Sequence, residues 1–88
     1  MKRSPDFMKR KIGTRYVIVA MGKATKQFDG MISVNGTGAL IWDLLEKEIT
    51  ESELAAALVA RFEVDPATAA ADVHGFITTL KGVGAVVE

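Results

Sequence analysis

The chain has 88 residues with 11 basic and 11 acidic side chains, one His and no Cys. A chain this short buries only about 60% of the surface that it exposes when unfolded, so we expect one domain over residues 1–88, with residues 1–6 as a flexible arm. The lack of Cys excludes disulfides, thiolate nucleophiles and zinc-thiolate sites, and one His does not make an imidazole-rich metal site. We therefore expect no catalytic residues, no metal ligands and no cofactor.

The zero net charge hides a split along the chain. Residues 1–28 hold eight basic residues against Asp6 alone, a net charge of +7, whereas residues 29–88 hold three basic against ten acidic residues, a net charge of −7. The sequence thus joins a basic third to an acidic remainder.

No segment of the sequence is typical of membrane insertion or secretion. The best apolar run, Tyr16 to Met21, is six residues long, far short of the ~20 that span a bilayer. Pro5, Asp6 and the Lys9 to Lys11 run interrupt the apolar stretch that a signal peptide needs. We expect a cytoplasmic protein that does not enter the membrane.

The first part of the chain has the alternation of β-strands. Phe7 to Ile12 predicts a first strand, Arg15 to Met21 a second and Met31 to Val34 a third. Gly13-Thr14 predicts a type II′ hairpin turn, because Gly tolerates a positive φ at the first central position. Gly22 to Gln27 predicts a polar loop.

From Asn35 onward the apolar spacing is helical, and caps mark three helices. The first begins near Asn35 to Thr37 and runs to about Lys47. The second opens with Thr50-Glu51-Ser52-Glu53, a capping box. The third opens with Asp65-Pro66 and ends at Gly82 or Gly84. We therefore expect an α+β, winged-helix-like fold, in which a three-stranded antiparallel meander precedes three α-helices.

A motif follows the third strand, where residues 34–45 read Val-Asn-Gly-Thr-Gly-Ala-Leu-Ile-Trp-Asp-Leu-Leu. This pattern resembles that of PqqD-like proteins, whose usual form is Leu-Asn-x-Thr-Gly/Ala-x-x-Ile-Trp-x-Leu-Leu. The resemblance covers most of residues 12–87 and continues through Thr50-x-x-Glu53-Leu54, Leu58, Phe62 to Asp65, Asp72-Val73, Phe76, Leu80 and Gly84.

The resemblance implies a recognition element for ribosomally made, post-translationally modified peptides, a peptide chaperone of natural product biosynthesis. Such proteins bind the leader segment of a precursor peptide and present the peptide to a modifying enzyme, often a radical S-adenosylmethionine protein. The leader is expected to add as a strand beside the third strand, in a cleft shared with the third helix. The expected partners are therefore the precursor peptide and the modifying enzyme.

The residues of the third strand fit this expectation. An edge strand is either protected or used for pairing, and Met31 to Val34 contains neither Lys nor Pro. Alternation places Ile32 and Val34 toward the core and Met31 and Ser33 outward. We predict that Met31, Ile32, Ser33 and Val34 bind the peptide backbone, although Met31 also fits an ordinary exposed apolar residue.

The third helix presents one flank beside its apolar stripe. At 100° per residue Asp72, Thr79 and Val83 fall next to Phe76. We predict that Phe76 and Val83 give apolar contact to the peptide and that Asp72 gives a polar one, with Thr79 beside them. Phe76 also fits simple core packing, and Asp72 also fits a solvated helix charge.

Two other functions compete with peptide binding. A winged-helix DNA-binding protein has a similar architecture, but the second and third helices are poor in the cations that phosphates require. A homodimer that pairs the third strands is compatible with peptide binding, because an empty edge can be capped by a second copy.

Overall fold

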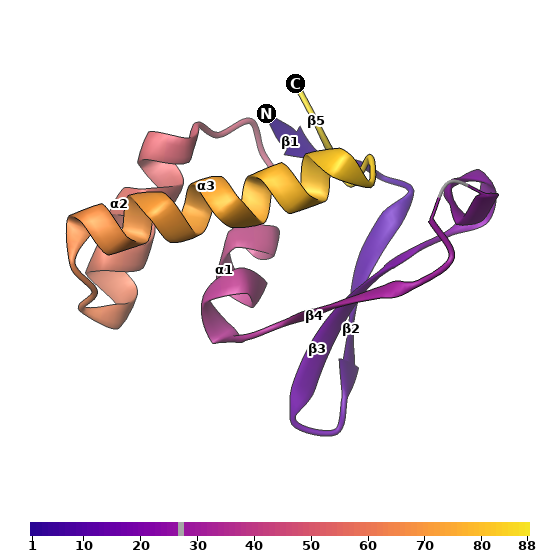
Figure 1. The fold of residues 1–88 in the computed structure, drawn as a ribbon, viewed down its shortest axis with the longest axis horizontal. Helices are drawn as coiled ribbons and strands as arrows, with labels where there is room; N and C mark the ends of the chain where they lie inside the picture. Colours follow the sequence, from indigo (N-terminus) through magenta and orange to yellow (C-terminus); the bar gives the residue numbers. More distant parts are fainter. Residues whose placement is uncertain (27) are drawn as a thin grey trace.

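The computed structural model describes residues 1–26 and 28–88. In chain order the elements are β1 (Lys2–Arg3), β2 (Phe7–Ile12), β3 (Arg15–Ala20), the 3-10 helix η1 (Gly22–Lys26), β4 (Met31–Val34), α1 (Gly36–Leu44), α2 (Glu51–Phe62), α3 (Pro66–Gly82) and β5 (Val86–Val87). Figure 1 shows the three helices grouped together and the β2–β3 hairpin extending from their side, with β4 crossing the hairpin on its way from η1 to α1. The predicted α+β meander followed by three helices is confirmed.

The main sheet has the strand order β2-β3-β4, and both pairings are antiparallel. Ile12 pairs with Arg15 across a two-residue loop in which Gly13 has a φ of 63°. Gly13 is the only loop residue with a positive φ, which is the pattern of the predicted type II′ turn. β2 and β4 are therefore the two edges of this sheet.

Side-chain caps set the start of each helix. Asn35 Oδ1 accepts a hydrogen bond of 2.9 Å from the Gly38 amide at the start of α1. Thr50 and Glu53 form the predicted capping box of α2, and the Asp65 carboxylate accepts from two amides at the start of α3. These bonds satisfy amides that have no partner within the helix.

The first residues do not form the expected flexible arm. β1 pairs antiparallel with β5, so that Lys2 lies opposite Val87 and Arg3 opposite Val86. The Arg3 amide donates to the Leu45 carbonyl at 2.8 Å, and the Arg3 guanidinium donates to the Trp42 carbonyl at 3.0 Å. The expectation that residues 1–6 form a flexible arm is therefore wrong. The partners of these residues lie about forty and eighty residues away in the chain, so no pattern in the neighbouring sequence indicates the pairing.

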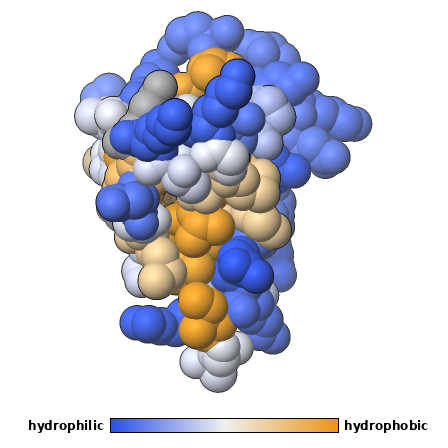
Figure 2. Space-filling view, turned by 90° about the vertical axis from the view of Figure 1, so that its right-hand side faces the viewer, coloured by the Kyte–Doolittle hydropathy of each residue, from blue (hydrophilic) through white to orange (hydrophobic). Residues whose placement is uncertain are grey.

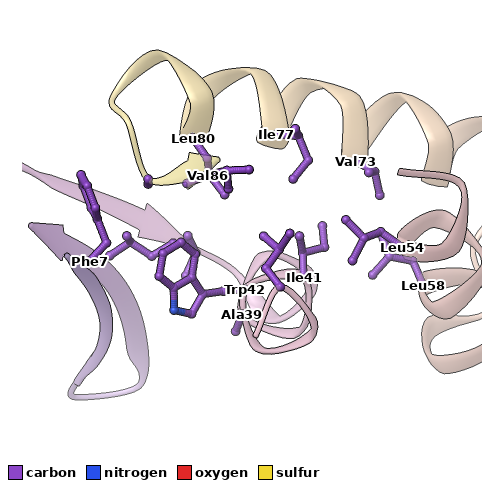
Figure 3. Close-up of a cluster of buried hydrophobic side chains, with 14 of the residues drawn as sticks. Phe7, Ala39, Ile41, Trp42, Leu54, Leu58, Val73, Ile77, Leu80 and Val86 are labelled. Atoms are coloured by element: carbon purple, nitrogen blue, oxygen red, sulfur yellow. The ribbon is translucent and has the colours of Figure 1, made fainter. Parts of the chain in front are cut away.

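The core lies between α3, the other two helices and the inner face of the sheet. Figure 3 shows Trp42 and Ile41 of α1 beneath the side chains that α3 projects downward, with Phe7 of β2 on one side and Leu54 and Leu58 of α2 on the other. The largest fully buried side chains are those of Trp42, Ile18, Ile41, Leu45, Leu54, Leu58, Ile77, Leu80 and Val73. This core fixes the position of α3 relative to β4.

Two boundaries differ from the sequence prediction. Residues Gly22–Lys26 form η1 rather than a loop, because Ala24 is buried against the core; the last residue of that predicted loop, Gln27, lies outside the described residues. α1 ends at Leu44 rather than near Lys47, because the chain turns at Leu45 and buries its side chain. None of the helices in the described part of the chain is long and apolar enough to cross a membrane.

Candidate functional site

An open cleft of about 780 Å³ lies where β3 and β4 meet the start of α1 and the middle of α3. Its wall combines backbone at the end of β4 with side chains from all three neighbouring elements. The lining residues are Thr14, Arg15, Tyr16, Ser33, Val34, Asn35, Gly36, Thr37, Gly38, Ile41, Asp72 and Phe76.

The start of α1 forms the floor of the cleft. Thr37 Oγ1 donates to Asn35 Oδ1 at 2.7 Å, so this one oxygen holds both the hydroxyl and the Gly38 amide. A Cβ on Gly38 would lie 3.1 Å from Val34 Cβ and 3.5 Å from Phe76 Cζ. Gly38 therefore allows α1, β4 and α3 to meet closely at this point.

The edge of β4 opens beside the cleft. Within residues 1–26 and 28–88, β4 pairs with β3 alone, so its other side carries backbone groups without a strand partner there. Met31 is 64% exposed, whereas Val34 is buried, as the predicted alternation requires. The opposite edge strand, β2, carries Lys9, Arg10 and Lys11, which oppose pairing with another strand.

The α3 wall of the cleft is apolar at its base and charged at its rim. Phe76 is half-buried and packs against the core, and Asp72 lies one turn earlier on the exposed surface. Arg15 lines the same cleft from the end of β3. Neither charge forms a salt bridge with another described residue, so both are available to a bound molecule.

The structure brings together only part of the predicted site. Ser33, Val34, Asp72 and Phe76 line the cleft. Met31 and Ile32 lie on β4 before the cleft begins, and Ile32 packs partly against the core.

Two predicted residues of α3 lie outside the cleft lining. Thr79 Oγ1 donates to the Gly75 carbonyl within the helix at 3.1 Å. Val83 caps the C-terminus of α3 and packs partly against the core.

Sequence reasoning missed the contribution of α1 and of the hairpin. The signal for α1 was the helix cap and motif that contains Asn35, Thr37 and Gly38. Because this motif directly follows the third strand, it could have placed these residues in the cleft. Arg15 and Tyr16 carry no such signal, because their approach to the cleft depends on the β3–β4 register.

The described residues offer no group of three side chains suited to a metal ion. The single His, His74, is exposed, and its Nδ1 lies 3.1 Å from Glu51 Oε1 on α2. This pair joins two helices away from the cleft.

The fold and the cleft define a small winged-helix-like α+β domain with an open sheet edge beside a helix. The chain belongs to the family described as Coenzyme PQQ synthesis protein D (PqqD), which matches residues 15–86. No curated protein matches the chain.

Two solved structures share this architecture. The structure described as TbiB1 in complex with the TbiA(beta) leader peptide is 26% identical, with a TM-score of 0.71 over 92% of this chain and 88% of that chain. Lasso peptide synthetase B1 complexed with the leader peptide is 22% identical, with a TM-score of 0.74 over 99% of this chain and 96% of that chain. The second likeness shows the fold alone.

Proposed function

We propose that this protein captures the leader segment of a ribosomally made precursor peptide by strand addition to β4 and presents the peptide to a modifying enzyme. The observation that carries this proposal is the unpaired edge of β4 directly beside a cleft walled by α3. Membership of the PqqD family and similarity to a protein determined with a leader peptide support it.

Strand addition alone gives weak binding. Each added hydrogen bond contributes only about 0.5 to 1.5 kcal/mol net, whereas ordering a disordered segment costs about 2 to 5 kcal/mol. Side-chain contacts in the cleft must therefore supply the rest of the affinity. Val34, Ile41 and Phe76 offer an apolar base for a leader side chain.

The charged residues at the rim of the cleft set the orientation of the bound leader and select its sequence. Arg15 suits an acidic leader residue, and Asp72 suits a basic or hydrogen-bonding one. Thr79 and Val83 continue the same side of α3 toward its C-terminus and would contact a leader that extends beyond the cleft.

The protein itself acts as a binding partner rather than as a catalyst in this proposal. The cleft contains an aspartate, an arginine and hydroxyl groups, but its lining has no histidine or cysteine to serve as a base or nucleophile. The chemistry then belongs to the modifying enzyme, for which a radical S-adenosylmethionine protein is our expectation.

Replacing Phe76 tests the cleft. We expect Phe76→Ala to weaken binding of the leader peptide by at least about tenfold, because buried aromatic contacts dominate such interfaces. The probe is the N-terminal segment of a precursor peptide chosen by searching the short reading frames near the gene of this protein, and its affinity is measured by isothermal titration calorimetry.

Phe62→Ala is the matched control. Phe62 is also half-buried against the core, but it ends α2 and does not line the cleft. Both variants should lose some stability, and only Phe76→Ala should lose affinity. Equal affinities for the two folded variants would contradict the assignment of the cleft.

A further inference from the structure

The face of the main sheet that points away from the helices carries mostly apolar side chains together with two arginines. The register places Met8, Val19 and Met31 in one row across the three strands, and Arg10, Val17 and Ser33 in the next. Ile12 and Arg15 follow at the hairpin end. Because side chains alternate along a strand, these residues share one face, opposite to Phe7, Ile18 and Val34 of the core. We call it the outer face.

The outer face exposes more apolar surface than single scattered residues would. Of the five large apolar side chains that are exposed in the described part of the chain, three belong to it: Met8 at 39%, Ile12 at 48% and Met31 at 64%. Figure 2 views the sheet side of the molecule and shows a hydrophobic band down its middle with hydrophilic margins. A contiguous apolar band with a polar rim is typical of a protein interaction site.

The charged side chains of the outer face are all positive. The three strands of the sheet contain Lys9, Arg10, Lys11 and Arg15 and no acidic residue. Lys9 lies on the inner face, where its ammonium contacts Asp43 at 2.8 Å. Arg10 and Arg15 remain on the outer face and form no salt bridge with a described residue. A partner surface that complements the outer face is therefore apolar and carries acidic side chains.

The outer face is continuous with the candidate peptide site. Met31 and Ser33 belong both to the outer face and to the β4 edge, and Arg15 borders the cleft as well. A leader strand added to β4 would extend the sheet and place every second side chain beside Met31 and Ser33. The surface offered to a partner would then combine this protein with the bound leader.

We propose that the outer face binds the enzyme that modifies the bound peptide, through an apolar surface of that enzyme that carries acidic side chains. The inference rests on the proposed leader binding. It explains how one small domain could hold the peptide and the enzyme at the same time, since the cleft and the outer face are adjacent and have only Arg15 and Ser33 in common. Because the bound leader would add to the surface offered to the enzyme, we expect the leader to raise the affinity for the enzyme, and by thermodynamic linkage the enzyme then raises the affinity for the leader by the same factor.

A second copy of this chain fits the face less well. Two outer faces packed together would bring Arg10 and Arg15 of both copies into one interface without an acidic partner from the strands. Unpaired like charges oppose such an interface. Self-association therefore becomes an outcome that the experiment must detect.

The test uses the double variant M8S/R10E. Met8 and Arg10 lie on β2, away from the cleft lining and from the β4 edge. The probes are a purified modifying enzyme, chosen by searching the genes near that of this protein, and, separately, the leader peptide. We expect at least about tenfold weaker enzyme binding by biolayer interferometry, leader affinity within about twofold of wild type, and tighter binding of the enzyme to the leader-loaded wild type.

Lys47→Glu is the control for the charge change, because Lys47 is exposed after α1 and outside the outer face. Its enzyme affinity should equal that of wild type. Unchanged enzyme affinity in the folded double variant would overturn the proposal. Wild-type dimers in sedimentation equilibrium that the double variant abolishes would overturn it in favour of a second copy. Failure of the leader to bind wild type would instead refute the proposed function.

Discussion

Asn35 both caps α1 and lines the candidate cleft. Its Oδ1 accepts from the Gly38 amide and the Thr37 hydroxyl, and the residue lines the cleft. The start of α1 and the shape of the cleft floor therefore depend on the same oxygen atom.

Asn35→Ala should lower the free energy of unfolding by about 1 kcal/mol, because the cap oxygen is lost. Urea denaturation followed by circular dichroism measures the change. Asn35→Asp keeps an oxygen at the same place and should remain close to wild type. An alanine variant as stable as wild type would show that the cap contributes nothing here.

At the scale of elements, β4 has the central role because it is short, uncharged and paired on one side only. In the proposed function the edge of β4 and the α3 wall together form the peptide site, and neither alone would hold a peptide tightly.

Ser33→Pro tests the edge of β4. Proline removes one backbone donor and opposes strand addition across it, so we expect leader affinity to fall about two- to tenfold, the equivalent of one net hydrogen bond. The helical circular dichroism signal should be largely retained. Lys11→Pro, on the opposite edge strand β2, is the control and should keep leader affinity. A folded Ser33→Pro variant with wild-type affinity would contradict strand addition.

Local signals predicted most elements correctly. The Gly13-Thr14 turn, the Thr50 capping box and the Asp65-Pro66 start all depend on neighbouring residues, and the structure has each of them. The pairing of β1 with β5 could not be predicted, because it joins opposite ends of the chain. Of the residues that the sequence proposed for peptide binding, Ser33, Val34, Asp72 and Phe76 line the cleft. The sequence did not indicate Arg15 and Tyr16, because their approach to the cleft depends on strand register.

At the scale of the whole molecule, the zero net charge separates into a basic sheet and acidic helices. β2 and β3 carry four cations and no acid, while α2 begins with Glu51 and Glu53. A winged-helix DNA-binding protein needs basic side chains where its helices contact the DNA phosphates. This distribution opposes DNA binding and suits acidic partners at the sheet.

Two assays check this distribution. A mobility-shift assay with duplex DNA at physiological salt should show no complex. The association rate of an acidic leader peptide, measured by stopped-flow fluorescence, should fall as salt concentration rises, because exposed charges steer the encounter and are screened. Tight DNA binding would contradict the argument from the charge distribution. An association rate that does not depend on salt would exclude electrostatic steering of the leader peptide.

The central claim, that a leader peptide adds to β4 beside α3, is tested most directly by an NMR titration of the ¹⁵N-labelled protein with the leader segment. We predict that amide resonances of residues 31–34 and of the Asp72 to Phe76 turn of α3 shift together and saturate at one equivalent. Shifts confined to residues 1–26 or to α2, or no shifts at all, would contradict the account.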